Sequence, residues 1–182
     1  LMTASSHPLP VHKDVVNAQV RLRDAIAVTP LLRNSRLDEM AKATLWIKAE
    51  NLQHNGAFKA RGAYNNIAQL RPEELAKGVI TYSSGNHGQA VAWAATLFEV
   101  NAKVFMPTSA PAIKRTAVEG YGAEIYACEP TLAARESTLA EVVERTGAVF
   151  IHPYDDERII AGQVTAALEL LEDTPDLEVV MS

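Results

Sequence analysis

The sequence predicts an α/β protein with a parallel β-sheet that helices cover on both faces. From residue 79 onward, short apolar runs alternate with longer amphipathic stretches, which is the strand–helix order that builds parallel sheets. The short runs are rich in β-branched residues, as buried strands are. The chain has 182 residues, 48% of them hydrophobic and 21% charged, so it is long enough to bury a sizeable core.

The part of the chain before residue 79 is expected to form two helices and one strand. These elements are Lys13–Ala27, Thr44–Glu50 and Ala60–Ile67. Pro30 follows the first helix and cannot continue it. Lys48 and Glu50 alternate on the outer face of the strand and are interpreted as a solvated pair. A turn at Asn55-Gly56 precedes the second helix.

Beyond residue 78 the alternation continues to the end of the chain. The predicted strands are 79–82, 102–106, 124–128, 148–151 and 177–181. The predicted helices are His87–Phe98, Ala112–Tyr121, Leu132–Thr146 and Ile159–Leu171. Gly122 and Gly147 close two of these helices, because glycine readily adopts the left-handed conformation that ends them. Asp156 and its acidic neighbours are expected to cap the last helix.

Composition excludes several classes of function. The formal net charge of −5, from 17 basic and 22 acidic residues, gives no basic face for nucleic acid or an anionic membrane. No run of about 18 apolar residues is present, so no membrane span is expected. The single cysteine, Cys128, excludes an internal disulfide and is interpreted as a small buried residue. The histidines show no metal-ligand spacing, so no metal site is expected, and a cytoplasmic location is the default.

One loop carries the residue types that a ligand site needs. In "TYSSGNHGQAVAWAA", the strand 79–82 leads into Ser83-Ser84-Gly85-Asn86, and a helix starts near His87. The serines and Asn86 can cap this helix, and N–H groups in its first turn suit a carboxylate or phosphate. A plain helix cap is the alternative. No G-x-G-x-x-G follows a strand and no G-x-x-x-x-G-K-[ST] is present, so the signatures of Rossmann dinucleotide binding and of P-loop NTPases are lacking.

The stretches "NGAFKARGAYN" and "SSGNHGQA", in this order and separation, resemble the fold-type II pyridoxal-phosphate enzymes. More narrowly, they resemble the serine/threonine dehydratase and serine racemase group, as do "VTPLLRN", "KAENLQ", "YGAEIYACEP" and "HPYDDERIIAGQVTAALELLE". The resemblance implies a fold like that of the tryptophan synthase β-subunit. Residues 73–152 would then form a complete small domain, and residues 1–72 and 153–182 part of a large cofactor domain.

By this resemblance, Lys59 forms a Schiff base with pyridoxal 5'-phosphate and takes the substrate Cα proton. Phe58 packs against the cofactor ring, and Asn86 hydrogen-bonds its 3'-oxygen. A lysine with these tasks must be partly deprotonated, which burial in a cleft favours.

The resemblance also assigns the residues that hold the substrate. They are Ser83, Ser84, Gly85, Asn86 and His87, which act largely through backbone N–H groups on the substrate carboxylate. Ser84 is in addition the position proposed to exchange a proton on the face opposite Lys59. Arg135 matches a position that approaches the carboxylate when the domains close, although an exposed helix arginine is the alternative reading.

Two residues depart from the family pattern, and one expected region is missing. Ala57 stands where serine is usual, and Val164 stands where glycine is usual and is expected to crowd a helix contact. Family members continue into a glycine-rich loop that holds the cofactor phosphate, then a Ser or Thr opposite the pyridine nitrogen and often a divalent-cation site. The 182 residues contain none of these, so the chain looks truncated and is expected to bind the cofactor poorly.

The activity implied is dehydration of L-threonine or L-serine to a 2-oxo acid and ammonia. This lyase reaction belongs to amino-acid metabolism and, for threonine, to isoleucine biosynthesis. Serine racemase and hydroxyaspartate dehydratase are alternatives within the same group, and a homo-oligomer is expected at full length. The alternative from another class is a non-catalytic fragment without a complete cofactor site.

Overall fold

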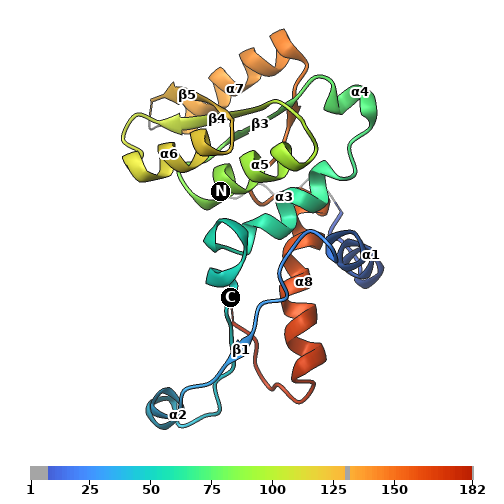
Figure 1. The fold of residues 1–182 in the computed structure, drawn as a ribbon, viewed down its shortest axis with the longest axis vertical. Coiled ribbons are helices and arrows are strands. Elements are labelled where there is room, and N and C mark those ends of the chain that lie inside the picture. Colours follow the sequence, from blue (N-terminus) through green and yellow to red (C-terminus); the bar gives the residue numbers. More distant parts are fainter. Residues whose placement is uncertain (1–7, 130–131, 182) are drawn as a thin grey trace.

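The computed structural model describes residues 8–129 and 132–181, without the side chains of residues 132–137. Its elements form two groups, which Figure 1 shows one above the other. The upper group is a sheet with its helices, and the lower group is a helical layer with a small hairpin. Helix α3 (Lys59–Ile67) lies where the two groups meet.

The upper group contains one four-stranded parallel sheet. Its strands are β3 (Val79–Tyr82), β4 (Ala102–Pro107), β5 (Glu124–Cys128) and β6 (Val149–Phe150). The order across the sheet is β5-β4-β3-β6, with Val79 paired to Ala102 on one side and to Val149 on the other. This sheet confirms the predicted α/β class and four of the five predicted strands after residue 78.

Helices cover both faces of the sheet, as predicted. Helix α5 (Asn86–Leu97) and helix α6 (Ala112–Gly120) share a core with Val104 and Met106 of β4. Helix α7 (Leu132–Thr146) shares a second core with the intervening residue Phe105 and with buried Cys128 of β5. Alternate residues of one strand point to opposite faces, so each face of the sheet has its own core.

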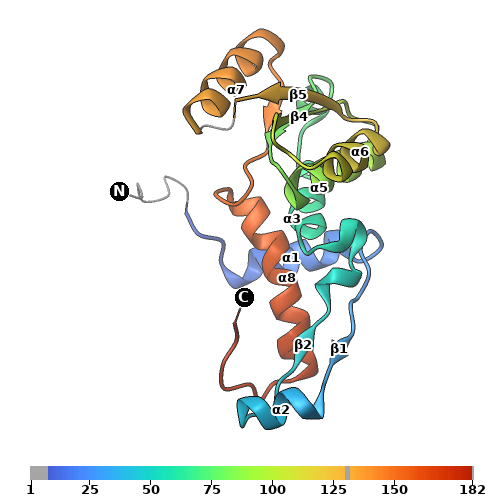
Figure 2. The same cartoon turned by 90° about the vertical axis from the view of Figure 1, so that its left-hand side faces the viewer.

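The lower group is built on the long helix α8 (Glu157–Asp173), which packs against α3 and against α1 (His12–Leu22). Asp156 caps α8 as predicted, because its side chain accepts hydrogen bonds from the backbone N–H groups of Arg158 (2.8 Å) and Ile159 (3.2 Å). A helix α2 (Ser35–Ala41) lies at the far end of the group, beside a hairpin of β1 (Leu31–Leu32) and β2 (Ile47–Lys48). Figure 2 shows this hairpin running alongside α8.

Gly162 sets how closely α8 approaches α3. A Cβ atom at this position would lie 2.7 Å from the carbonyl oxygen of Arg61 and 2.7 Å from the Cα of Gly62. Both neighbours are backbone atoms, which cannot move aside without shifting α3. The start of α3 is therefore held against α8 at a distance that only glycine permits.

Replacing Gly162 by alanine should lower the free energy of unfolding by roughly 1–3 kcal/mol, the usual cost of overpacking a tight contact. Urea unfolding followed by circular dichroism measures it. Gly120→Ala on α6 is the matched control, because nothing lies within 4 Å of a Cβ atom there. The close helix contact would be contradicted if the two substitutions had the same effect.

Before residue 79, two predictions are wrong in detail and two helices were missed. Helix α1 ends at Leu22 and not at Ala27. Ala27 lies outside the helix, where the Gln53 side chain accepts a hydrogen bond from Ala27 N (3.0 Å) and donates one to Ala27 O (2.7 Å). The predicted strand Thr44–Glu50 shrinks to the two residues of β2, with a 3₁₀ turn from Glu50 to Leu52 after it. Helix α2 and the short helix α4 (Pro72–Leu75) were not predicted.

The predicted last strand, 177–181, is also wrong. In the described part of the chain no strand pairs with this segment, and its residues 178–181 are exposed, Val179 by 73% and Met181 by 86%. A strand forms only when a neighbour completes its backbone hydrogen bonds. The apolar pattern of this segment therefore has no sheet to join.

No helix of the described residues is long and apolar enough to span a membrane.

Candidate active site at the carboxyl ends of strands β3 and β6

Two loops meet at the carboxyl edge of the sheet. One follows β3 and leads through Ser83-Ser84-Gly85 into α5, and the other follows β6 and leads to α8. Because β3 and β6 are parallel neighbours, both loops leave the same edge. The carbonyl oxygen of Ile151 joins them, accepting from Thr81 Oγ1 (2.8 Å) and lying 3.3 Å from His87 Nε2.

Lys59, the first residue of α3, reaches this edge from the lower group. Its Nζ donates a hydrogen bond to the carbonyl oxygen of Pro153 (2.9 Å), two residues beyond Ile151. The Nζ also lies 5.2 Å from the centre of the Phe58 ring. Burial lowers the pKa of this half-buried amine below its ordinary 10.5, and in the described residues no carboxylate opposes the shift. The resulting amine is easier to deprotonate than a surface lysine.

His87 is buried between the two loops, with only 4% of its surface exposed. Burial, the largest cause, lowers its pKa from 6.5 to about 4, and the charges of Lys59 and His152 act in the same direction against the hydrogen bond to Ile151. The ring is therefore neutral at pH 7, with its proton on the nitrogen that faces the Ile151 carbonyl. Its Nδ1 is buried, and no partner for it occurs among the described residues.

Because the pKa of His87 is lowered in the folded protein, we expect the free energy of unfolding to fall between about pH 6.5 and pH 4. The unfolded chain binds a proton on His87 in that range and the folded chain does not, so acidification favours unfolding, by up to about 3 kcal/mol at pH 4. Unfolding free energies of the wild type and of His87→Gln across this range measure the effect. The substitution should flatten the slope, whereas the exposed His12→Gln should leave it unchanged; equal slopes in all three would count against a neutral buried ring.

Helix α5 begins without the side-chain cap that the sequence predicts. The N-cap residue is Gly85, and in the described structure no side chain caps the helix. Ser83 Oγ instead accepts a hydrogen bond from Gly85 N (3.1 Å). Because Gly85 has no side chain to occupy them, the N–H groups in the first turn of α5 face the loop and carry the positive end of the helix dipole. This arrangement suits a carboxylate better than the predicted cap would.

Three of the remaining predicted residues, Ser84, Asn86 and Phe58, lie around this edge. Ser84 and Asn86 are exposed, and Phe58 is 42% exposed. Asn86 Oδ1 accepts a hydrogen bond from Lys114 Nζ (2.9 Å), a contact that no sequence motif indicated. The amide nitrogen of Asn86 is then the atom suited to donate to a cofactor oxygen. Arg135 is in α7, and its side chain lies outside the described residues.

A cluster of four buried charges, the Arg61 cluster, supports α3 behind Lys59. Its members are Arg61, Lys48, Glu50 and Glu169. The fully buried Arg61 guanidinium bonds Glu50 through Nε (2.8 Å) and Nη2 (2.7 Å), and Glu169 through Nη1 (2.6 Å) and Nη2 (3.0 Å). Lys48 Nζ lies 2.7 Å from Glu169. Two positive charges thus meet two negative ones, and the cluster ties β2, α3 and α8 together.

The Arg61 cluster overturns the interpretation of Lys48 and Glu50 as a solvated pair. The Lys48 side chain is only 7% exposed, whereas Ile47, predicted to face inward, is 42% exposed. Burial alone would raise the pKa of Glu169, but hydrogen bonds from Arg61 and Lys48 outweigh it and lower that pKa. The alternation predicted the wrong environment for Lys48 and Glu50, because their charge partners, Glu169 and Arg61, are brought to them by folding.

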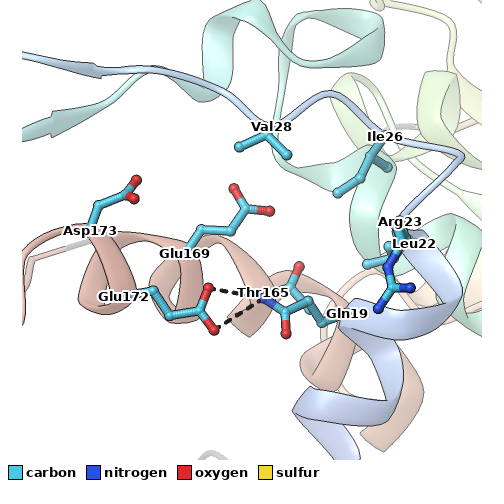
Figure 3. A pocket seen from close by; sticks show the side chains of 9 residues that line it. All are labelled: Gln19, Leu22, Arg23, Ile26, Val28, Thr165, Glu169, Glu172 and Asp173. Atoms are coloured by element: carbon cyan, nitrogen blue, oxygen red, sulfur yellow. Dashed lines mark hydrogen bonds between the residues drawn. The ribbon is translucent and has the colours of Figure 1, made fainter.

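A separate cavity lies between α1, α8 and residues 23–28 (Figure 3). It measures about 330 Å³ and is lined by Gln19, Leu22, Arg23, Ile26, Val28, Thr165, Glu169, Glu172 and Asp173. Gln19 Nε2 donates to the Glu172 carboxylate at 3.2 and 3.4 Å across it. None of the residues predicted to bind cofactor or substrate lines this cavity, so it is distinct from the candidate active site.

The other histidines have structural contacts. His54 stacks on Trp93 with ring centres 4.9 Å apart, and His152 Nδ1 accepts from Tyr154 N (3.2 Å) and Asp155 N (2.7 Å). His7 lies outside the described residues. Within residues 8–129 and 132–181, no group of three or more His, Cys, Asp or Glu side chains is placed to hold a metal ion.

Comparison with known proteins identifies a family whose members this chain resembles. The family model described as "Pyridoxal-phosphate dependent enzyme" matches residues 22–182. Serine racemase of Dictyostelium discoideum is 45% identical over 170 residues, which are 93% of this chain and 52% of that protein. L-threonine ammonia-lyase of Thermotoga maritima is 42% identical over 169 residues, 93% of this chain and 42% of that protein. The solved structure of maize serine racemase matches with a TM-score of 0.91 at 40% identity, covering 94% of this chain and 52% of that one. The chain thus spans about half the length of these relatives.

Proposed function

The chain belongs to the family of pyridoxal-phosphate-dependent enzymes, in the group of serine racemases and serine/threonine dehydratases, and from this premise we propose that it carries the lysine-bearing part of an active site for a β-hydroxy amino acid. The single observation that carries the proposal is the placement of Lys59. Its half-buried amine, with a lowered pKa, stands at the sheet edge where the Ser83–His87 loop begins α5.

The residues present fit both the cofactor and the substrate. The Lys59 amine suits the cofactor aldehyde, because burial favours the deprotonated, nucleophilic form. The open first turn of α5 suits the substrate carboxylate. Phe58 offers an exposed ring beside Lys59, and the amide nitrogen of Asn86 offers a donor to the 3'-oxygen. Pyridoxal phosphate, when bound, draws electrons from the substrate Cα and so makes its proton acidic.

In the proposed reaction, residues of this chain transfer protons and orient the substrate. Lys59 Nζ takes the Cα proton from one face of the substrate, which requires it to leave the Pro153 carbonyl to which it donates here. We assign to the Ser84 hydroxyl, which is exposed at the loop, the exchange of a proton on the opposite face, as the family resemblance implies. The N–H groups of α5 orient the carboxylate, and the neutral His87 ring fixes the two loops to each other through Ile151.

Serine is the substrate that we favour. The expected threonine dehydratase activity has less support than its alternative, because serine racemases stand among the most similar relatives at 45% identity, beside the threonine ammonia-lyase at 42%. Removal of the Cα proton is common to racemisation and dehydration, so both reactions can share one site. The preference for threonine, and with it a place in isoleucine biosynthesis, stays a proposal, as does hydroxyaspartate as a substrate.

Ser84→Ala should separate the two reactions. Without the hydroxyl, conversion of L-serine to D-serine should fall by about 100-fold or more, the usual contribution of a general acid or base, while formation of the 2-oxo acid should change by only a few fold. Chiral analysis of serine and an assay for the 2-oxo acid, on one reaction mixture with added pyridoxal phosphate, measure both. Ser83→Ala is the control. Equal losses of the two activities would rule out the proton-exchange role of Ser84.

The second candidate is a non-catalytic fragment without a complete cofactor site. Uptake of pyridoxal phosphate by the wild type and not by Lys59→Ala, read from absorbance, separates it from the enzyme.

A further inference from the structure

The side chain of Lys114 reaches the candidate active site from helix α6, which lies outside the stretches that resemble the family. Lys114 is in the first turn of α6, and its Nζ donates a hydrogen bond to Oδ1 of Asn86 (2.9 Å). The same Nζ would lie 4.0 Å from a Cβ atom built on Gly85, the N-cap residue of α5. Lys114 therefore stands beside the uncapped first turn of α5.

Strand β4 anchors the two helix starts that this hydrogen bond joins. Arg115 Nη2, in the first part of α6, donates to the carbonyl oxygens of Pro107 (2.9 Å) and Thr108 (3.2 Å). The loop that leads into α5 is held by a hydrogen bond from Ser83 N to Phe105 O (2.9 Å). The two helices also pack against each other on one face of the sheet (Figures 1 and 2). The bond between them thus links two anchored groups.

The position of Lys114 is electrostatically unfavourable in the structure as it stands. The first turn of a helix carries the positive end of the dipole and favours acidic residues, yet α6 has none there. The start of α5 lies alongside and adds a second positive helix end. In the described part of the chain, no carboxylate pairs with the Lys114 ammonium. This concentration of positive charge without a counterion favours an anion at the same place.

Lys114 also decides which way the Asn86 amide faces. An ammonium group has three donors and no acceptor, so the amide must turn its oxygen toward Lys114 and its NH₂ group away. Among the described residues, the exposed Nδ2 of Asn86 has no acceptor. Without Lys114 this amide could rotate and present its oxygen to a ligand oxygen, which it would repel. Lys114 selects the orientation in which Asn86 donates.

We propose that Lys114 is a positioning residue that holds the Asn86 amide as a donor to the ionised 3'-oxygen of pyridoxal phosphate and stabilises that anion by its charge. The inference rests on the proposed function, in which Asn86 meets this oxygen. Lys114 acts on the cofactor through Asn86 and through the field at the helix starts. Its influence should therefore disappear when the 3'-oxygen is absent.

A cofactor analogue tests this dependence. The probe is 3-deoxypyridoxal 5'-phosphate, which keeps the aldehyde for Lys59 and lacks only the 3'-oxygen. Lys114→Met should lower the affinity for pyridoxal phosphate by about 10-fold, the effect of one hydrogen bond to a charged group, and leave the affinity for the analogue within about 2-fold of the wild type. In an Asn86→Ala background, Lys114→Met should cause no further loss. Equilibrium titrations followed by absorbance measure all of these affinities.

The spectrum of the bound cofactor gives a second readout. Ionisation of the 3'-oxygen produces the long-wavelength, yellow band, so Lys114→Met should shift intensity from this band to the short-wavelength band of the neutral hydroxyl. Lys114→Arg keeps the charge and the donor and should restore both the spectrum and the affinity. Lys77→Met, at an exposed lysine, is the matched control and should change neither. Circular dichroism checks the fold of each variant.

The inference is overturned if Lys114→Met weakens the two cofactors equally, which would mark a merely structural role, or weakens neither. It is also overturned if Lys77→Met has the same effect as Lys114→Met. A wild type that takes up pyridoxal phosphate on Lys59 but does not differ from Lys114→Met contradicts this inference alone. A wild type that takes up no cofactor contradicts the proposed function, and this inference with it.

Discussion

Replacing Arg61 by methionine is expected to lower the free energy of unfolding by about 3–5 kcal/mol, the cost of removing one partner from a buried charge network. Arg61 is fully buried and makes five hydrogen bonds to Glu50, Glu169 and Thr165. Without it, two carboxylates face each other in the interior with only Lys48 to balance them. Urea unfolding measures the loss.

Arg71→Met provides the control for this experiment. Arg71 also pairs with two glutamates, Glu73 and Glu74, but its side chain is 68% exposed, so water and salt screen the pairs. We expect a much smaller loss of stability.

The dependence of stability on acid pH gives a second check. The pKa of Glu169 is lowered in the folded protein, so its stabilising effect holds at neutral pH and is lost as the pH falls through the folded-state pKa. Equal losses for Arg61 and Arg71 would contradict the role of burial.

Replacing Lys59 by alanine should remove both racemase and dehydratase activity, by about 1,000-fold or more, because the proposed function gives this one side chain two tasks, holding the cofactor and moving the Cα proton. Stability should change little, since its Nζ is bound only to the Pro153 carbonyl among the described residues. Assays with L-serine and added pyridoxal phosphate measure the loss. The exposed Lys77→Ala is the control and should retain activity. A Lys59→Ala protein that folds and keeps its activity would exclude this lysine from the chemistry.

The sheet could be predicted from the sequence because its signals are local. Strands β3, β4, β5 and β6 each coincide with a short apolar run, and α5, α6, α7 and α8 with the stretches between or after them. Their hydrophobic residues face a core on either side, which is what the pattern encodes.

Contacts between distant residues could not be predicted in this way. Lys48 and Glu50 alternate like a solvated strand face, and only Arg61 and Glu169, brought close by folding, show that the face is buried. Segment 177–181 has the composition of a strand but finds no neighbour in the described chain. Pattern predicts which residues prefer a strand, and pairing decides whether one forms.

In the candidate site, too, some features could be predicted from the sequence and others could not. Family resemblance pointed to Lys59 and the Ser83–His87 loop, and the structure brings both to one sheet edge. The family resemblance did not indicate that the buried Nδ1 of His87 has no partner among the described residues, or that Lys114 donates a hydrogen bond to Asn86. Both depend on how α5, α6 and the loop after β6 pack, which no single motif contains.

The most direct test of the central claim is to find which lysine holds the cofactor. The protein is incubated with pyridoxal phosphate, reduced with borohydride so that any bound cofactor is fixed covalently, digested, and mapped by mass spectrometry. We expect one dominant label, on Lys59, and its loss in Lys59→Ala. A dominant label on Lys114 or another lysine, or an even spread over the exposed lysines, would contradict the assignment of this site.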